Sequence, residues 1–197
     1  MTQPDLDIDE LLRTLQSPYG SEQHVRARQN AARALLQLAD KSYPRIIELL
    51  TTGAAANDLV LIELLPAFGR DDSVPLLSGI LLSGRERAAR IAGGALARHQ
   101  SSLAEHALEA GLQSEIPEAI IASADGLLDR GDAQACRALI SRASIDDATV
   151  RYHVLLAATR LGCLNAPALQ RMLDSELDAD IRELLQAAID GMESPRE

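Results

Sequence analysis

The chain has 197 residues, with 19 Lys+Arg against 29 Asp+Glu, which gives a formal net charge of -10. Hydrophobic residues make up 47% of it, but there is no Trp and one Phe, so the apolar content is almost entirely aliphatic. This aliphatic bulk excludes a disordered chain, and the acidic excess argues against a nucleic-acid binder, which needs clustered Lys and Arg. We therefore expect one folded unit that does not bind nucleic acid.

The negative charge is concentrated in the second half of the chain. Residues 1–100 carry 12 acidic and 11 basic groups, and residues 101–197 carry 17 and 8, so the net charges are -1 and -9. Solvated helix faces are the ordinary explanation of such a bias. If the protein binds a basic partner surface, this half is where we expect it.

Features of export or membrane insertion are not seen. Residues 1–7 lack the basic and apolar regions of a signal peptide, and no apolar run reaches the ~18 residues of a membrane span. We expect a cytoplasmic protein that does not enter the membrane. The two cysteines do not suggest a disulfide framework. We expect Cys136 to lie in the core and Cys163 in an accessible turn.

The N-terminal segment has the pattern of a capping helix. Residues 5–15 carry an apolar stripe, and the Ser-Pro-Tyr-Gly-Ser sequence that follows within residues 16–21 is typical of a turn. We divide the chain into a cap and linker at 1–22, a repeat array at 23–192 and a disordered tail at 193–197. The last helix of the array, at 179–192, is expected to close its far end.

Two kinds of helix alternate along the array. The first kind has apolar residues about four positions apart, as in Ala27/Ala31/Leu35/Leu38, Leu61/Leu65/Phe68, Val150/Val154/Ala158/Leu161 and Ile181/Leu185/Ile189. The second kind has apolar positions three and seven residues after the first: Tyr43/Ile46/Leu50, Val74/Leu77/Leu81, Ser101/Ala104/Leu108, Ala133/Cys136/Ile140 and Ala166/Leu169/Leu173. The last members of these triplets are 31, 27, 32 and 33 residues apart. This spacing predicts an internal repeat of helix pairs.

The turn residues agree with this periodicity. We place Pro44, Pro75 and Pro167 in the first turn of the second helices, where a missing N–H costs nothing. Glycines occur where helices are expected to end, because glycine tolerates the left-handed conformation there: Gly53, Gly69, Gly84, Gly131 and Gly162. No segment alternates in the manner of a strand, so we predict an all-α protein.

With these repeats the chain resembles the HEAT-like family, in the short form of about 30 residues that also occurs in phycobilisome lyases. The resemblance rests on Val150-Arg151 through Leu161-Gly162, on Ala27-Arg28 through Leu38, and on Ile181-Arg182. It implies an α-α superhelix, a right-handed solenoid of about five helix pairs with a terminal capping helix.

The third and fourth copies depart from the pattern. Arg98-His99 and Arg130-Gly131 replace the usual Leu-Gly ending, so these first helices are expected to be bent or shifted. Within the third copy, Gly93-Gly94 costs about 1 kcal/mol per glycine relative to alanine. Close packing between helices is the ordinary explanation of the two glycines, and a hinge is the alternative.

A search for chemistry finds no catalytic, cofactor or metal site. HEAT-repeat proteins that hold iron use His-Glu pairs, and no histidine of this chain is followed by Glu. We therefore expect surface or helix-end roles for His24, His99, His106 and His153. The stretch 174–180 has Ala179 where a calcium loop requires Gly, and is better interpreted as a turn with capping carboxylates. A DNA glycosylase of the HEAT-like type would need aromatic residues and a basic groove, which this composition does not offer. We expect no enzyme activity.

What remains is surface. In HEAT-like arrays the second helices line the concave face, and this face usually binds the ligand. The resemblance therefore implies a groove that suits an extended peptide or a helix. The candidate protein-binding residues come from the positions one and two residues after each middle apolar residue, together with the acidic Glu109: Ile47, Glu48, Ser78, Glu105, His106, Glu109, Arg137, Gln170 and Arg171. We predict a non-enzymatic interaction module that acts as adaptor, scaffold or assembly factor. The alternatives are a phycobilin-lyase-like subunit and an immunity- or antitoxin-like protein that neutralises a basic effector.

Overall fold

The computed structural model describes residues 7–18, 20–52 and 58–193, without the side chains at 58 and 193. Within these residues all regular structure is helical and no strand forms. The α-helices are α1 Ile8–Gln16, α2 Glu22–Gln37, α3 Ala39–Thr52, α4 Asp58–Leu64, α5 Val74–Leu81, α6 Glu86–Arg98, α7 Ser102–Leu112, α8 Pro117–Arg130, α9 Cys136–Arg142, α10 Ala148–Arg160, α11 Ala166–Ser175 and α12 Ala179–Glu193. Three 3-10 turns precede or follow them: η1 Leu65–Phe68, η2 Asp71–Ser73 and η3 Ala133–Ala135.

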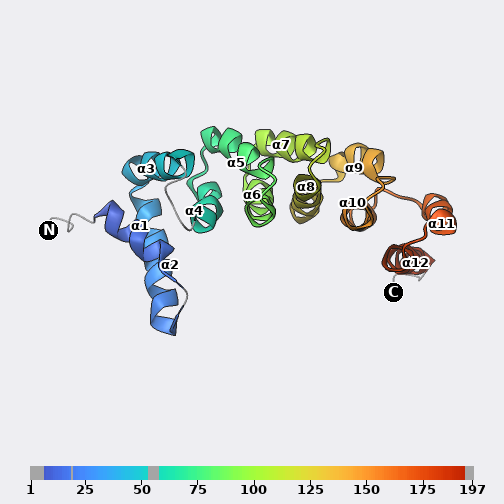
Figure 1. The fold of residues 1–197 in the computed structure, drawn as a ribbon, viewed down its shortest axis with the longest axis horizontal. Coiled ribbons are helices and arrows are strands. Elements are labelled where there is room, and N and C mark those ends of the chain that lie inside the picture. Colours follow the sequence, from blue (N-terminus) through green and yellow to red (C-terminus); the bar gives the residue numbers. More distant parts are fainter. Residues whose placement is uncertain (1–6, 19, 53–57, 194–197) are drawn as a thin grey trace.

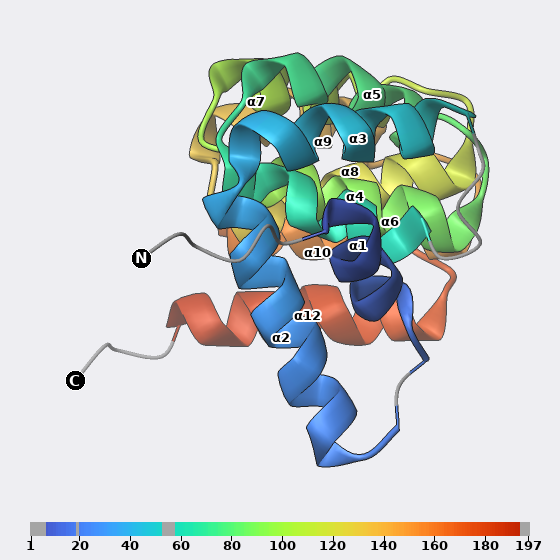
Figure 2. The same ribbon diagram turned by 90° about the vertical axis from the view of Figure 1, so that its left-hand side faces the viewer.

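The helices form two rows that follow a common arc (Figure 1). One row contains α3, α5, α7, α9 and α11, and the other contains α4, α6, α8, α10 and α12. Successive helices of the chain alternate between the rows, as the alternation of the two apolar patterns predicts. A view along the array shows the same layering, with α2 and α12 both lying on the side of the second row (Figure 2).

The curvature corrects one expectation. The row of α3, α5, α7, α9 and α11, which are the second helices of the pairs, follows the outer side of the arc and not the concave side (Figure 1). The distance between packed helices depends on the side chains at their contact. In the inner row Gly93 of α6 lies against the backbone of Ala122 in α8, and Gly126 of α8 lies against Gly93, so these helices approach closely.

The N-terminal helix packs on the first helix pair. The Asp7 side chain accepts a hydrogen bond from the Asp9 N–H at the start of α1, and α1 packs on α2 through the buried Leu12 and Leu15. The part of this expected helix at 5–6 lies outside the described residues. At the other end α12 continues through Glu193, one residue into the expected tail, and 194–197 are not described.

The buried positions match most of the predicted triplets. All members of Tyr43/Ile46/Leu50 and Val74/Leu77/Leu81 are buried, and so are the apolar stripes of α10 up to Ala158 and of α12. The prediction is wrong at Ala27, which is exposed, and in the fourth copy. There Ala135, Leu139 and Ala143 are buried, and Ile140 is 43% exposed. The turn η3 displaces the start of α9, so the apolar face follows a register one residue earlier than we placed it.

Turn residues behave as expected, with one exception. Gly69, Gly84, Gly131 and Gly162 have φ between 64° and 72°, in the left-handed region that favours glycine. The fifth predicted stop, Gly53, lies outside the described residues. Pro75 and Pro167 lie in the first turn of α5 and α11, but Pro44 lies inside α3, because that helix begins already at Ala39.

The irregular endings of the third and fourth copies connect neighbouring pairs, and α6 and α8 are regular helices. His99, which is 2% exposed, donates from Nε2 to the Arg70 carbonyl at 3.2 Å and accepts from the Ser101 N–H at Nδ1. The Arg130 guanidinium in turn donates to the His99 carbonyl. A related contact precedes them, since the Tyr43 hydroxyl donates to Asp72 at 2.5 Å. Because these contacts span 29, 31 and 29 residues, they recur at the repeat period and fix each pair to the next.

Candidate functional site

A groove between α7 and α9 collects three of the predicted binding residues. His106 and Glu109 line it from α7, and Arg137 lines it from α9. Its volume is about 690 Å³, and its remaining walls are Ala110, Gln113, Gln134, Ala138 and Ser141. On each helix the lining positions recur at intervals of three or four residues, so each wall is one polar helix face. The Gln113 amide and the Ser141 hydroxyl lie 3.5 Å apart across the groove.

A pair of carboxyl groups lies beside this groove. Asp132 precedes η3 and caps it through Oδ1, which accepts from the Gln134 N–H at 2.8 Å. Its second oxygen, Oδ2, is buried without a hydrogen-bond donor among the described residues. A hydrogen bond that Glu105 shares with Asp132, followed by burial and repulsion between the two charges, raises the pKa of Glu105, while the Arg130 charge lowers it.

The other predicted residues lie elsewhere along the outer row and do not form a common site. Glu48, on α3, is paired with Arg45 at 2.7 Å, and Arg45 also contacts Asp9. Ile47 and Ser78 are half-buried on α3 and α5. On α11, the Gln170 amide donates to Asp174 at 2.8 Å, and Arg171 is exposed.

The histidines have local roles in the structure. The His24 ring lies within 3.2 Å of the Ser21 backbone and side chain at the start of α2, and His99 is the C-cap of α6. Both are therefore helix-end residues, as expected. His153 lies inside α10 and contacts Asp125 of α8 at 2.8 Å, a contact that the sequence does not predict.

The acidic stretch 174–180 contains the end of α11, the turn at 176–178 and the start of α12, so the expected turn lies within it. Asp178 Oδ1 accepts from the N–H groups of Asp180 and Ile181 and so caps α12. Glu176 forms a two-pronged ion pair with Arg151 of α10, with both N–O distances at 2.9 Å. The Arg151 hydrogen bond is the main reason that the pKa of Glu176 is lowered, although burial opposes it.

The two cysteines form a disulfide, which corrects the expectation of a core thiol and a free thiol. Cys136 is the first residue of α9, and Cys163 lies in the turn that leads to α11, so the bond joins chain positions 27 residues apart. The register error in the fourth copy explains why sequence reasoning missed it. Cys136 was assigned to a core position that Ala135 occupies, whereas its side chain points toward the next pair.

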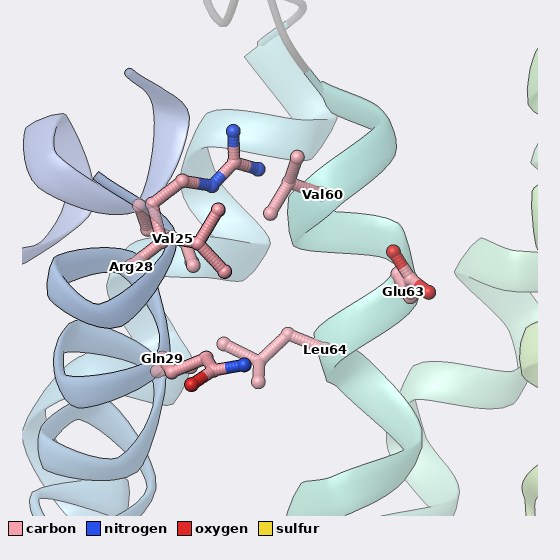
Figure 3. A pocket seen from close by; sticks show the side chains of 8 residues that line it. Val25, Arg28, Gln29, Val60, Glu63 and Leu64 are labelled. Atoms are coloured by element: carbon pink, nitrogen blue, oxygen red, sulfur yellow. The ribbon is translucent and has the colours of Figure 1, made fainter. Parts of the chain in front are cut away.

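An apolar hollow of about 260 Å³ separates α2 from α4 (Figure 3). Val25 and Gln29 of α2 face Val60 and Leu64 of α4 across it. Arg28 forms part of the wall and donates to the Ser17 carbonyl at 2.7 Å. The next two inner helices, α4 and α6, pack directly against each other. Between α2 and α4 the hollow takes the place of such a contact, so α2 is set apart from the rest of the inner row.

No protein-family model matches the chain, and no curated protein matches it. Among the described residues, no group of three or more His, Cys, Asp or Glu side chains is arranged to hold a metal ion. In the same part of the chain no helix combines the length and the apolar character that crossing a membrane requires.

Proposed function

We propose that the helix pairs form a short HEAT-like solenoid and that the protein is a non-enzymatic interaction module, an adaptor or scaffold that binds a partner peptide. The observation that carries this proposal is the groove between α7 and α9. Two helix faces with polar side chains at regular intervals offer repeated hydrogen-bonding positions along one line, which suits an extended segment of another protein.

The groove has both signs of charge. Glu109 lines one wall and Arg137 lines the other. Arg137 is exposed and so is available to a carboxylate of a bound segment, while Glu109 is available to a basic group. A partner segment with both charges fits this arrangement, because each charge of the segment then faces its opposite across the groove.

The test compares two reversals of charge on equivalent outer helices. Arg137→Glu changes the groove, and Arg171→Glu changes an exposed arginine of α11 that does not line it. Peptides selected from a phage-displayed random library on the wild-type protein serve as probes, with affinities measured by calorimetry. We expect Arg137→Glu to weaken binding by about tenfold and Arg171→Glu to leave it nearly unchanged.

Thermal unfolding of both variants provides the control, since substitutions at exposed positions change stability by about 0.5 kcal/mol or less. Equal affinities of Arg137→Glu and the wild type for the selected peptides would refute the groove as the binding site. If the library yields no peptide that binds the wild-type protein, the adaptor proposal itself fails.

A further inference from the structure

A second groove, between α9 and α11, differs from the first in its chemistry. Ile140 of α9 and Ala143, the residue that caps the end of α9, line one wall, and Met172 and Ser175 of α11 line the other. The spacing of three residues on each helix means that one face of each helix forms a wall. Its volume is about 380 Å³, and its other lining residues include Ile145, Leu155 and Leu177.

The groove leaves large apolar side chains in solvent. Leu177 is 95% exposed at its rim, and Ile140 is 43% exposed on its wall. Exposed apolar side chains that lie singly are ordinary, but these two belong to one hollow together with the half-buried Ile145 and Met172. Burial of such side chains against a partner is favourable by about 25 cal/mol for each Å² of apolar surface removed from water.

Cross-links at both ends of the groove fix the positions of α9 and α11. At the start of α9, the Cys136–Cys163 disulfide joins the helix to the turn that leads into α11. At the opposite end, Arg151 donates to the Ile145 carbonyl after α9 and forms the ion pair with Glu176 after α11. The helices α9 and α11 make little direct contact, and α11 stands apart from α9 in the outer row (Figure 1). A groove fixed in this way is organised before a partner binds, which lowers the entropy cost of binding.

The negative charge around the groove favours an occupant with positive charge. Its charged lining residues are Asp146, Glu176 and Arg151, two carboxylates against one guanidinium. Glu176 is neutralised by Arg151, so the exposed Asp146 carries the uncompensated charge. The surrounding half of the chain, residues 101–197, has 17 acidic and 8 basic groups.

We propose that the α9–α11 groove is a docking site for an amphipathic helix of a partner protein, with leucine-like side chains on one face and lysine or arginine beside them. The apolar side chains of the helix enter between Ile140 and Leu177, and a basic residue faces Asp146. This site is separate from the α7–α9 groove and binds a different kind of segment.

Synthetic peptides test the proposal on the full chain with its disulfide intact. The probes are an amphipathic peptide of leucine and lysine and a peptide of the same pattern with glutamate in place of lysine, titrated by calorimetry. We expect the lysine peptide to bind and the glutamate peptide not to bind. Leu177→Ser and Ile140→Ser should each weaken binding by about tenfold or more. Leu103→Ser, at a 51% exposed leucine of α7 outside the groove, should not change it.

The results that would overturn the proposal are equally specific. They are the absence of binding of the lysine peptide to the wild type, equal binding of both peptides, or unchanged affinity in Leu177→Ser and Ile140→Ser. Sedimentation that shows a dimer of the wild type, lost in Leu177→Ser, would assign the groove to a second copy of the chain instead. Because Arg137→Glu leaves this groove intact, its effect on the lysine peptide should be nil, which keeps this test independent of the proposed function.

Discussion

Two adjacent glycines of α6 allow a test of how the inner row is packed. At Gly93 an added Cβ would lie 2.4 Å from the Ala122 carbonyl oxygen and 3.1 Å from the Ala122 Cβ. The obstacle is mainly the backbone of α8, so relief requires a shift of one helix against the other. At Gly94 the nearest atom is the flexible Arg98 guanidinium at 3.5 Å, which is ordinary contact. Gly93→Ala and Gly94→Ala therefore make the same chemical change at neighbouring positions of one helix that have different surroundings.

The expected magnitudes follow from these distances. Replacing a helical glycine by alanine gains about 1 kcal/mol through helix propensity. At Gly93 an overpacking cost of about 3 kcal/mol exceeds this gain, so the variant should lose about 2 kcal/mol. At Gly94 no such cost applies, so that variant should gain about 1 kcal/mol. For a chain of this size, the shifts correspond to a Tm lower by about 4–8 °C in Gly93→Ala and higher by about 2–4 °C in Gly94→Ala.

Thermal and urea unfolding followed by circular dichroism measure both variants. The slope of the urea transition should stay constant, because a change in slope would mean that the cooperativity of the array, not its packing, has changed. If Gly93→Ala is as stable as the wild type, or if both variants shift in the same direction, close approach of α6 and α8 is not the reason for glycine at Gly93. A hinge at this pair would instead be supported if both substitutions stabilise the chain.

Three further changes test other contacts. Ser123 is fully buried, and its hydroxyl has no hydrogen-bond partner among the described residues. Ser123→Ala should therefore stabilise the protein by about 1 kcal/mol in urea unfolding, and a loss of stability would contradict this. Glu176→Gln should cost about 3 kcal/mol at pH 7, because it breaks the ion pair with Arg151. The folded-state pKa of Glu176 is lowered, so this stabilisation is present above the pKa of Glu176 in the unfolded chain and disappears as the pH falls through the folded-state pKa. The stabilities of the wild type and the variant should therefore converge in acid, and a difference that stays constant with pH would contradict this. Reduction of the Cys136–Cys163 bond, which closes 27 residues of chain, should lower the unfolding free energy by about 3.5 kcal/mol, and Cys136→Ser should reproduce this value without reductant.

Much of the secondary structure could be predicted from the sequence. The apolar stripe of α10 and the triplet Tyr43/Ile46/Leu50 are buried as predicted, because a helix with 3.6 residues per turn places such residues on one face. The four described glycine stops have the positive φ that only glycine adopts without cost. These features depend on neighbours along the chain, so local sequence determines them.

The candidate sites could be predicted only in part. His106, Glu109 and Arg137 were expected on the second helices, and they line the α7–α9 groove. The α9–α11 groove was not predicted, because Ile140 was assigned to the core and Leu177 to an ordinary turn. Whether an apolar residue is buried depends on how closely the next helix packs, which no local pattern contains.

What the sequence by itself determined, then, is the alternation of two helix types and, outside the fourth copy, the face that most of these helices bury. Only the tertiary structure decided the direction of curvature, the Cys136–Cys163 bond and the open spacing of α9 and α11. Each of these depends on distances between residues of different helix pairs. Such distances arise from the sizes of the side chains in contact, such as the glycine at Gly93 against the backbone of Ala122, and they accumulate over the whole array.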